Sequence, residues 1–151
     1  MKTFFLFMIG VLALSGCQSG NQQESDKVPF DIANRYFVKN SADNKLLSLN
    51  KIDSQHIFDQ LYGPAATMGQ DGVPTHIDFT RQFVISVILP PTELATEIHP
   101  GALEQSADGN LLFTYQVQKG DSMSFTIVPN LLIVVDRSYD GPVSVKELTG
   151  L

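Results

Sequence analysis

The chain has 151 residues, a formal net charge of −6 and a single cysteine. One cysteine excludes an internal disulfide and a cysteine-based zinc site, so any folded part must be held together by its apolar core. The mildly acidic balance, without runs of like charge, excludes the strongly basic surface that nucleic-acid binding requires.

The first sixteen residues have the pattern of a secretory signal. Lys2 supplies a positive charge, and the eleven residues 4–14 that follow carry no polar side chain. A helix that crosses a bilayer needs about 20 apolar residues, whereas the core of a signal has about 7–15. The pattern therefore predicts a signal peptide over residues 1–16 rather than a membrane span.

The next residues indicate which kind of signal this is. Leu14-Ser15-Gly16-Cys17 resembles the lipobox of bacterial lipoproteins, in which a small residue precedes an obligatory cysteine. The resemblance implies that the thiol of Cys17 receives a diacylglyceryl group and that cleavage leaves Cys17 as the new N-terminus. An ordinary secretory signal with a chance cysteine is the alternative.

Acylation of Cys17 predicts a membrane-anchored protein of the cell envelope, because two or more acyl chains hold a protein stably on a bilayer. Gln18 stands where an aspartate signals inner-membrane retention in some lineages, which favours the outer membrane. Residues 17–27 contain no apolar residue after the cysteine, so they cannot offset the entropy of ordering and we expect a flexible tether. Residues 28–151 have the usual size of a single domain.

The N-terminal part of this domain predicts one strand and one helix. Residues 34–39 favour a strand, and the polar, turn-rich residues 40–50 follow it. Asp53 is placed to cap a helix over residues 54–62, because its carboxylate can accept an unpaired amide of the first turn. Gly63-Pro64 would end that helix.

The remainder predicts strands separated by turns. The almost wholly apolar residues 83–89 are typical of a strand covered on both faces, and residues 111–118 alternate as a half-buried strand does. Close spacing of the elements favours antiparallel pairing. The expected fold class is α+β, mostly an antiparallel β-sheet with one N-terminal helix packed on it. Further strands are expected at 124–128, 131–135 and 143–148, with turns at 108–109, 119–121 and 140–142.

Sequence motifs for common enzyme chemistry are absent. The histidines lie at none of the close spacings typical of metal sites, no serine occupies a G-x-S-x-G turn, and no glycine-rich phosphate loop occurs. His76 and Asp78 could place two ligands on one strand face, but a turn histidine beside a strand-opening aspartate is the simpler interpretation. We therefore predict no metal, no cofactor and no catalytic residue.

The leading hypothesis is a lipid-anchored binding or interaction domain of the cell envelope. Two alternatives to it remain open. In the first, a hydrolase brings distant acids together, and Asp78 is the first candidate because burial beside an apolar strand would raise its pKa. The competing interpretation of Asp78 is a turn carboxylate bonded to nearby backbone amides. The second alternative is a small-molecule or lipid binder with a pocket between helix and sheet.

Two long loops are the candidate binding segments, because loops held by a rigid sheet are where contact residues concentrate. The first covers residues 63–76 and the second covers residues 89–98, which begin with two prolines after the apolar strand. Plain connections are the competing interpretation of both. The candidate contact residues are Met68, His76, Asp78, Thr92, Glu93 and Glu97.

Several short elements between residues 58 and 135 occur in a recognisable order. They are an aromatic helix, Pro74, Ile77-Asp78-Phe79 before an apolar strand, Pro91-Thr92, Glu97-Ile98, and Pro129 before residues 131–135. This order resembles the C-terminal domain of the protease-complex subunit PrcB family, although Glu93-Leu94-Ala95-Thr96 replaces that family's T-G-G-Y-type turn. The resemblance implies a non-enzymatic lipoprotein that associates with and stabilises an extracytoplasmic protease.

Overall fold

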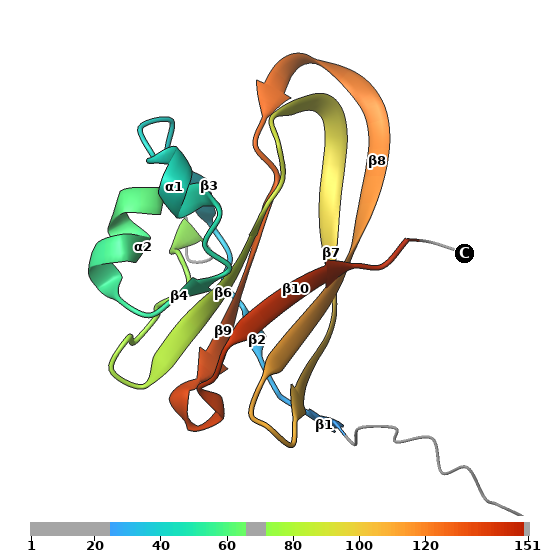
Figure 1. The fold of residues 1–151 in the computed structure, drawn as a ribbon. Helices are drawn as coiled ribbons and strands as arrows, with labels where there is room; N and C mark the ends of the chain where they lie inside the picture. The colour runs from blue at the N-terminus through green and yellow to red at the C-terminus, as the bar shows by residue number, and fades with distance from the viewer. Residues whose placement is uncertain (1–24, 66–71, 150–151) are drawn as a thin grey trace, which may run out of the picture.

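The computed structural model describes residues 25–65 and 72–149. These residues form two facing four-stranded sheets, with short helices on the outer face of one of them (Figure 1). Within the described part, no helix is long and apolar enough to cross a bilayer. Cys17 and Met68 lie outside the described residues, as does the expected signal.

The two sheets contain four strands each and are named here by their place in the molecule. We call one the outer sheet, with the order β1-β7-β8-β10, and the other the central sheet, with the order β2-β9-β6-β4. Within them only β8 and β10 pair in parallel, so the expected β-rich, mostly antiparallel architecture is confirmed. The outer strands are β1 (Ser25–Lys27), β7 (Thr92–Ser106), β8 (Leu111–Ile127) and β10 (Val143–Glu147). The central strands are β2 (Asp31–Ile32), β4 (Lys51–Ile52), β6 (Gln82–Ile88) and β9 (Asn130–Asp136).

One long hairpin, bent back on itself, supplies the middle strands of both sheets. β6 pairs with β9, and the same two chain segments continue as β7 paired with β8. They are joined by residues 89–91 and 128–129, and both links contain proline, which cannot donate to a ladder. The Leu89 N–H donates to the Pro129 carbonyl at 2.9 Å and holds the two links together. We call this place, at the top of Figure 1, the bend.

The main core lies between the two sheets and is built from alternate residues. Phe83, Ile85 and Val87 of β6 point toward the outer sheet, and each is almost fully buried. Phe113 of β8 meets them from the other side and packs edge-on against Phe30, with ring centroids 5.7 Å apart. The same core contains Val28, Leu103, Leu111, Tyr115, Leu131, Ile133 and Val135.

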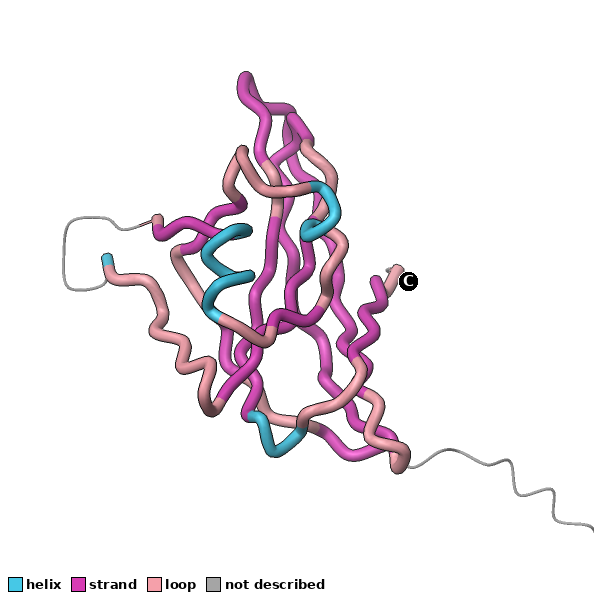
Figure 2. The backbone as a smooth tube through the Cα atoms, turned by 60° about the vertical axis from the view of Figure 1, so that its left-hand side comes forward, coloured by secondary structure: helices cyan, strands magenta, loops and turns pink. Residues whose placement is uncertain are grey.

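A second core covers the opposite face of the central sheet. The intervening strand residues Val84, Leu132 and Val134 face α1 (Asn44–Leu47) and α2 (Gln55–Leu61), from which Phe58 and Leu61 of α2 are buried. Figure 2 shows these helices lying over the strands. Because both faces of β6 and β9 are covered, both strands are apolar at nearly every position.

The helices differ from the expectation in number and in capping. α2 lies within the expected range, but its cap is Ser54, whose hydroxyl accepts the Ile57 N–H at 3.4 Å. Asp53 does not cap it, because ion pairs hold its carboxylate elsewhere. The additional helix α1 lies in the stretch expected to be turns, and its cap Asp43 accepts the Lys45 N–H at 2.9 Å.

The chain leaves α2 earlier than expected. Tyr62 is already extended and begins β5 (Tyr62–Pro64), which pairs with β3 (Tyr36–Val38), inside the expected strand. The expected turns at 108–109 and 140–142 are present. Gly109 adopts a φ of 81°, in the left-handed region that favours glycine, and the short 3-10 helix η2 (Arg137–Tyr139) leads into the second turn.

Three expectations about connections are wrong. Residues 92–98 belong to strand β7 and not to a loop, and residues 119–121 lie inside β8 rather than at a turn. Both stretches are polar because little of the protein covers them, so they lack the burial pattern of a strand. The expectation of a tether over residues 17–27 is wrong for its last three residues, since Ser25–Lys27 pair with Glu104, Gln105 and Ser106 as β1.

Candidate functional site

The structure separates the candidate contact residues into two places. His76 and Asp78 precede β6, whereas Thr92, Glu93 and Glu97 follow it at the bend. β6 has seven residues, so the two groups lie about 20 Å apart along the sheet. They therefore do not form one site.

Asp78 is a turn carboxylate. Its Oδ1 accepts the Thr80 hydroxyl at 2.6 Å and the Thr80 N–H at 3.0 Å. These hydrogen bonds lower the pKa of Asp78, and the nearby positive charge of Arg81 adds to the effect. The hypothesis of a buried acid with a raised pKa is wrong, and the turn interpretation is confirmed.

Neither the histidine beside Asp78 nor the buried serine forms a reactive group. His76 is exposed, and no cluster of three or more metal-ligating side chains occurs in residues 25–65 and 72–149. Ser86 is buried and its hydroxyl lies 2.6 Å from the Tyr62 hydroxyl, whose pKa is raised by burial. Ser86 is thus a core hydroxyl with a hydrogen-bond partner.

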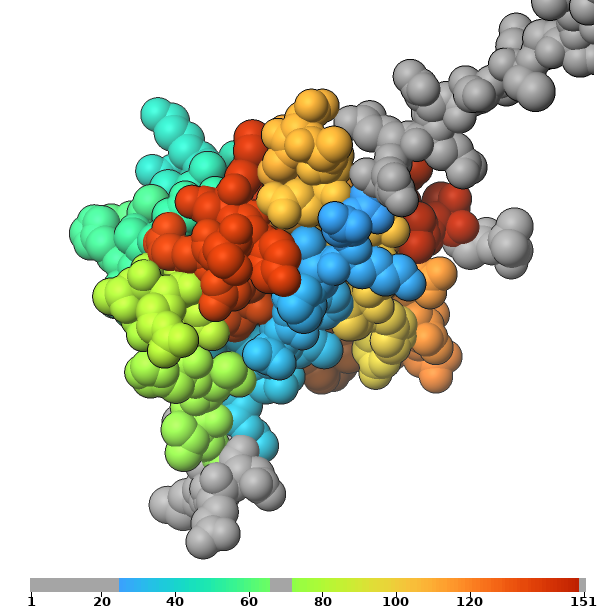
Figure 3. All heavy atoms as spheres, turned by 90° about the horizontal axis from the view of Figure 1, so that it is seen from below, coloured from blue at the N-terminus to red at the C-terminus, as the bar shows by residue number. Residues whose placement is uncertain are grey.

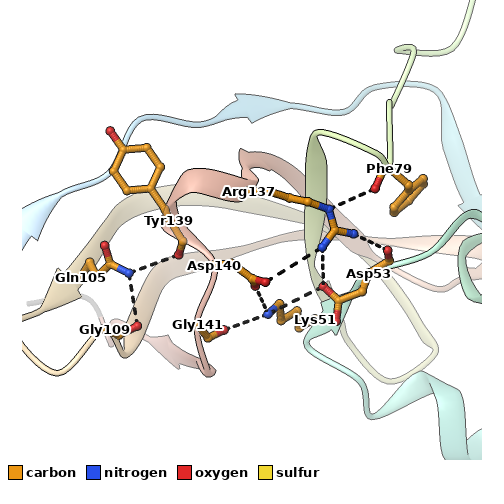
Figure 4. Close-up of polar contacts among 9 residues, drawn as sticks. All are labelled: Lys51, Asp53, Phe79, Gln105, Gly109, Arg137, Tyr139, Asp140 and Gly141. Atoms are coloured by element: carbon orange, nitrogen blue, oxygen red, sulfur yellow. Dashed lines mark hydrogen bonds and ion pairs between the residues drawn. The ribbon is translucent and has the colours of Figure 1, made fainter.

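The end of the sandwich opposite the bend is tied together by a cluster of four charges (Figure 4). Arg137 donates to the Asp53 carbonyl at 2.6 Å and to the Phe79 carbonyl at 3.0 Å. Lys51 pairs with Asp140 and donates to the Gly141 carbonyl at 3.0 Å. The cluster thus joins β4 to the segment that leads into β10.

This charged cluster is structural. Its two cations and two anions neutralise one another, and the hydrogen bond from Lys51 lowers the pKa of Asp140. Lys51 also lies over the Phe83 ring, 4.9 Å from its centroid, so its charge helps to cover the main core. Each of the four charged groups has an ion-pair partner within the cluster.

The candidate binding site lies at the bend and not at the charged cluster. A pocket of about 320 Å³ opens where the two sheets separate. The hydroxyl of Thr92 accepts the Leu94 N–H at 3.1 Å, and the hydroxyl of Thr96 donates to the Leu94 carbonyl at 2.9 Å, so both are used within the protein. The apolar wall consists of Leu89, Pro90, Pro91, Val117 and Pro129, and the polar rim consists of Thr92, Thr96, Lys119 and Glu147.

Sequence reasoning found one part of this pocket and missed the rest. Thr92 was a candidate, and Pro90-Pro91 marked the place where the first strand ends. Lys119 and Glu147 come from β8 and β10, so only tertiary structure brings them together. Pro129 could have indicated the second link of the bend. It interrupts the apolar pattern in the segment that is hydrogen-bonded to residues 89–91.

The strands beside the pocket form a ribbon with little cover. We call residues 92–98 of β7 together with residues 117–127 of β8 the ribbon; it curls over at the top of Figure 1. Leu94 is 36% exposed and Phe125 is 59% exposed, and the ladder is irregular between them. Glu93 and Glu97 are exposed on the same ribbon.

The pocket rim carries one acid, Glu147 of β10, and one cation, Lys119 of β8. The exposed acids Glu93, Glu97 and Asp121 lie on the ribbon and do not line the pocket. His99 lies 3.6 Å from the Glu97 carboxylate.

Comparisons with known proteins add no family to this geometry. No family model matches the chain, and neither the curated proteins nor the solved structures contain a match. The bend, its pocket and the ribbon are therefore the features that indicate a function.

Proposed function

We propose that this chain is a lipid-anchored protein of the cell envelope that binds another protein through the ribbon and the bend. The observation that carries the proposal is the exposure of Leu94 and Phe125 on the segments of β7 and β8 that pair only with each other, beside a pocket with apolar walls. Aromatic residues are enriched at protein interfaces, where their burial contributes much of the binding energy.

The position of the chain's N-terminal end supports a partner in solution rather than in the bilayer. β1 lies beside the β7–β8 turn and the η2 segment when the molecule is seen from below (Figure 3), whereas the bend lies at the other end. Seven residues separate Cys17 from Ser25, so an anchor at Cys17 lies at most about 29 Å from β1. The fifteen residues of β7 span up to about 50 Å, and the ribbon is thus directed away from an anchoring membrane.

The pocket also favours a protein over a free small molecule. Its volume of about 320 Å³ is at the lower end of the range for small-molecule sites, roughly 300–1,000 Å³. It is better suited to one or two side chains of a partner. The resemblance of Pro74, Ile77-Asp78-Phe79 and Pro91-Thr92 to the PrcB family suggests the partner's class, an extracytoplasmic protease stabilised by association.

The test uses a photo-cross-linking residue placed at position 125 in cells that make the full chain. We expect a discrete protein adduct at 125 and none at 112, because Leu112, although 38% exposed, lies on the packed part of the same strand and outside the ribbon. In a chain that carries the cross-linking residue at position 94 instead, Phe125→Ser should reduce the yield of the adduct about tenfold. Equal labelling at 125 and 112, or no adduct at 125, would contradict the proposal.

The anchor is tested separately. Acyl labelling and membrane fractionation should place the wild-type chain, labelled, in the outer-membrane fraction. Cys17→Ala should be unlabelled and released from the membrane, while its folded domain stays intact. A soluble, unlabelled wild type would show that the anchor part of the proposal is wrong and would leave the binding surface to be judged by cross-linking alone.

A further inference from the structure

The outer sheet ends in a strand that has a partner on one side only. β10 is the last strand of the order β1-β7-β8-β10 and pairs in parallel with β8, from Val143 opposite Leu111 to Glu147 opposite Tyr115. The two bonds at its ends define which residues face β8. The Leu111 N–H donates to the Pro142 carbonyl at 2.8 Å, and the Leu148 N–H donates to the Tyr115 carbonyl at 2.7 Å.

In a parallel ladder, alternate residues of a strand direct both backbone groups to the same neighbour. Residues 142, 144, 146 and 148 therefore bond to β8, and Val143, Val145 and Glu147 direct their N–H and C=O groups away from the sheet. Within the described residues, the backbone groups of these three residues have no other hydrogen-bond partner. β10 thus presents a regular row of backbone donors and acceptors on its free side.

This free edge leads directly to the pocket at the bend. Val143 and Val145 point inward and pack against the main core, and Glu147 follows them at the next inward position. Glu147 is also part of the pocket rim. Since residues directly opposite each other in a sheet point to the same face, the residue paired with Glu147 on an added strand would point toward the pocket.

We propose that the free edge of β10 binds an extended segment of the partner protein as an additional strand, with a large apolar side chain of that segment in the bend pocket and Lys or Arg beside it. Backbone hydrogen bonds to Val143, Val145 and Glu147 supply affinity, and the pocket supplies specificity. This inference rests on the proposed protein-binding function and names how the partner is held.

The pocket rim carries one acid and one cation. Glu147 lies at the rim with Lys119, so a Lys or Arg side chain of an added strand can pair with the Glu147 carboxylate there. A second copy of this chain has the same net charge of −6 and is repelled by the first. Its inward-facing Val143 and Val145 are also committed to its own core and do not reach into a neighbour's pocket.

The chain's own N-terminal segment does not fit the pocket either. Residues 18–24 read QSGNQQE and contain no apolar side chain, so they have nothing to place against Leu89, Val117 and the prolines. They also enter the fold at β1, on the opposite edge of the outer sheet from β10. The occupant is therefore a segment of another protein.

The test selects binders from a phage library of random peptides about twelve residues long, displayed against the full chain purified from membranes in detergent. Enriched peptides are synthesised, and their affinities are measured on matched variants. Val145→Pro removes an N–H that β8 does not use, and proline is tolerated on an edge strand whose N–H faces solvent. Val145→Thr keeps both the N–H and the β-branched shape and is its control.

A second variant tests the pocket without altering the edge. Thr96→Phe comes from β7 and fills the pocket while β10 is unchanged. We expect enriched peptides to share an apolar residue flanked by Lys or Arg. Val145→Pro and Thr96→Phe should each weaken their binding at least about tenfold, as loss of a backbone bond or of an anchor side chain does, and Val145→Thr should change it less than about twofold.

Each of these results would overturn the inference: no enriched sequence, peptide binding unchanged in Val145→Pro, or a wild-type dimer in sedimentation that Val145→Pro dissociates. A cross-link at position 125 that persists in Val145→Pro also overturns it and leaves the proposed function intact. If position 125 forms no adduct while the peptides bind as expected, the proposed contact through the ribbon fails and the strand-binding edge stands.

Discussion

The β7–β8 hairpin has two halves with similar ladders and different surroundings. Near the turn, β1 and β10 flank the hairpin, and Leu103, Leu111 and Phe113 are at most 1% exposed. Near the bend, neither flanking strand continues, and Leu94 and Phe125 remain exposed. Backbone pairing therefore extends along the whole hairpin, whereas the fully buried apolar side chains lie in the half near the turn.

This difference indicates where stability and function reside. Because burial of apolar surface is the dominant favourable term in folding, the half near the turn should contribute most of the stability. Local opening is easiest where few apolar contacts hold a segment, so the ribbon is free to adapt to a partner. Matched residues from the two halves should therefore differ in how much their substitution lowers the free energy of unfolding.

Two phenylalanines of β8 provide the largest expected contrast. Phe113 is fully buried in the main core, and Phe125 is 59% exposed on the ribbon. Phe113→Ala should lower the free energy of unfolding by about 3–5 kcal/mol, because it removes buried area and leaves a cavity. Phe125→Ala should change it by less than about 0.5 kcal/mol in urea titrations. Equal losses would show that the ribbon is packed as tightly as the core.

Two glycines sharpen the comparison at the level of the backbone. A Cβ at Gly101 would lie 2.8 Å from the Thr114 carbonyl oxygen, whereas a Cβ at Gly120 would lie 3.3 Å from the Ala95 carbonyl oxygen. Gly101→Ala should therefore cost about 1–3 kcal/mol through overpacking. Gly120→Ala, on the ribbon, should cost less than about 1 kcal/mol. Thermal unfolding of the two variants measures the difference, and the reverse order would contradict it.

Acid should affect the packed end selectively. The hydrogen bond from Lys51 lowers the pKa of Asp140 below its ordinary value of 3.8. A carboxyl whose folded pKa is lowered stabilises the fold above its unfolded pKa, and this contribution disappears as the pH falls through the folded pKa. Asp140→Asn should therefore cost up to about 1 kcal/mol at neutral pH, since the pair is partly exposed, and nothing well below pH 4.

The control for this pH experiment comes from the ribbon. Asp121 is exposed and makes no ion pair within the described residues, so Asp121→Asn should leave the melting temperature unchanged at neutral pH. A constant difference between wild type and Asp140→Asn from pH 7 down to pH 3 would show that the Lys51 pair does not stabilise the fold.

The pattern of burial explains which elements could be predicted. β6 and β9 were recognisable because apolar residues occupy nearly every position, which occurs when both faces of a strand are covered. Residues 92–98 were misread as a loop because their side chains are mostly exposed, although their backbone is fully extended. Exposed strands lack the alternation on which sequence-based prediction depends.

The candidate site was predictable only in part for the same reason. Pro90-Pro91 marked a bend, since proline interrupts a ladder, and Thr92 follows it directly. Asp78 was a poor candidate because its pKa depends on Thr80 hydrogen bonds that form only in the folded turn. The polar cluster around Arg137 left no signal, since Lys51 and Asp140 are 89 residues apart.

By itself, the sequence determined the local properties of the described part of this protein: strands covered on two faces, and turns at Gly109 and Gly141. Each of these depends on neighbouring residues. Only the tertiary structure decided that one hairpin bends at Pro90-Pro91 and Pro129 to form two sheets, and that β10 ends with Glu147 in the bend pocket. The physical reason is that packing between distant segments leaves little trace in the residues on either side.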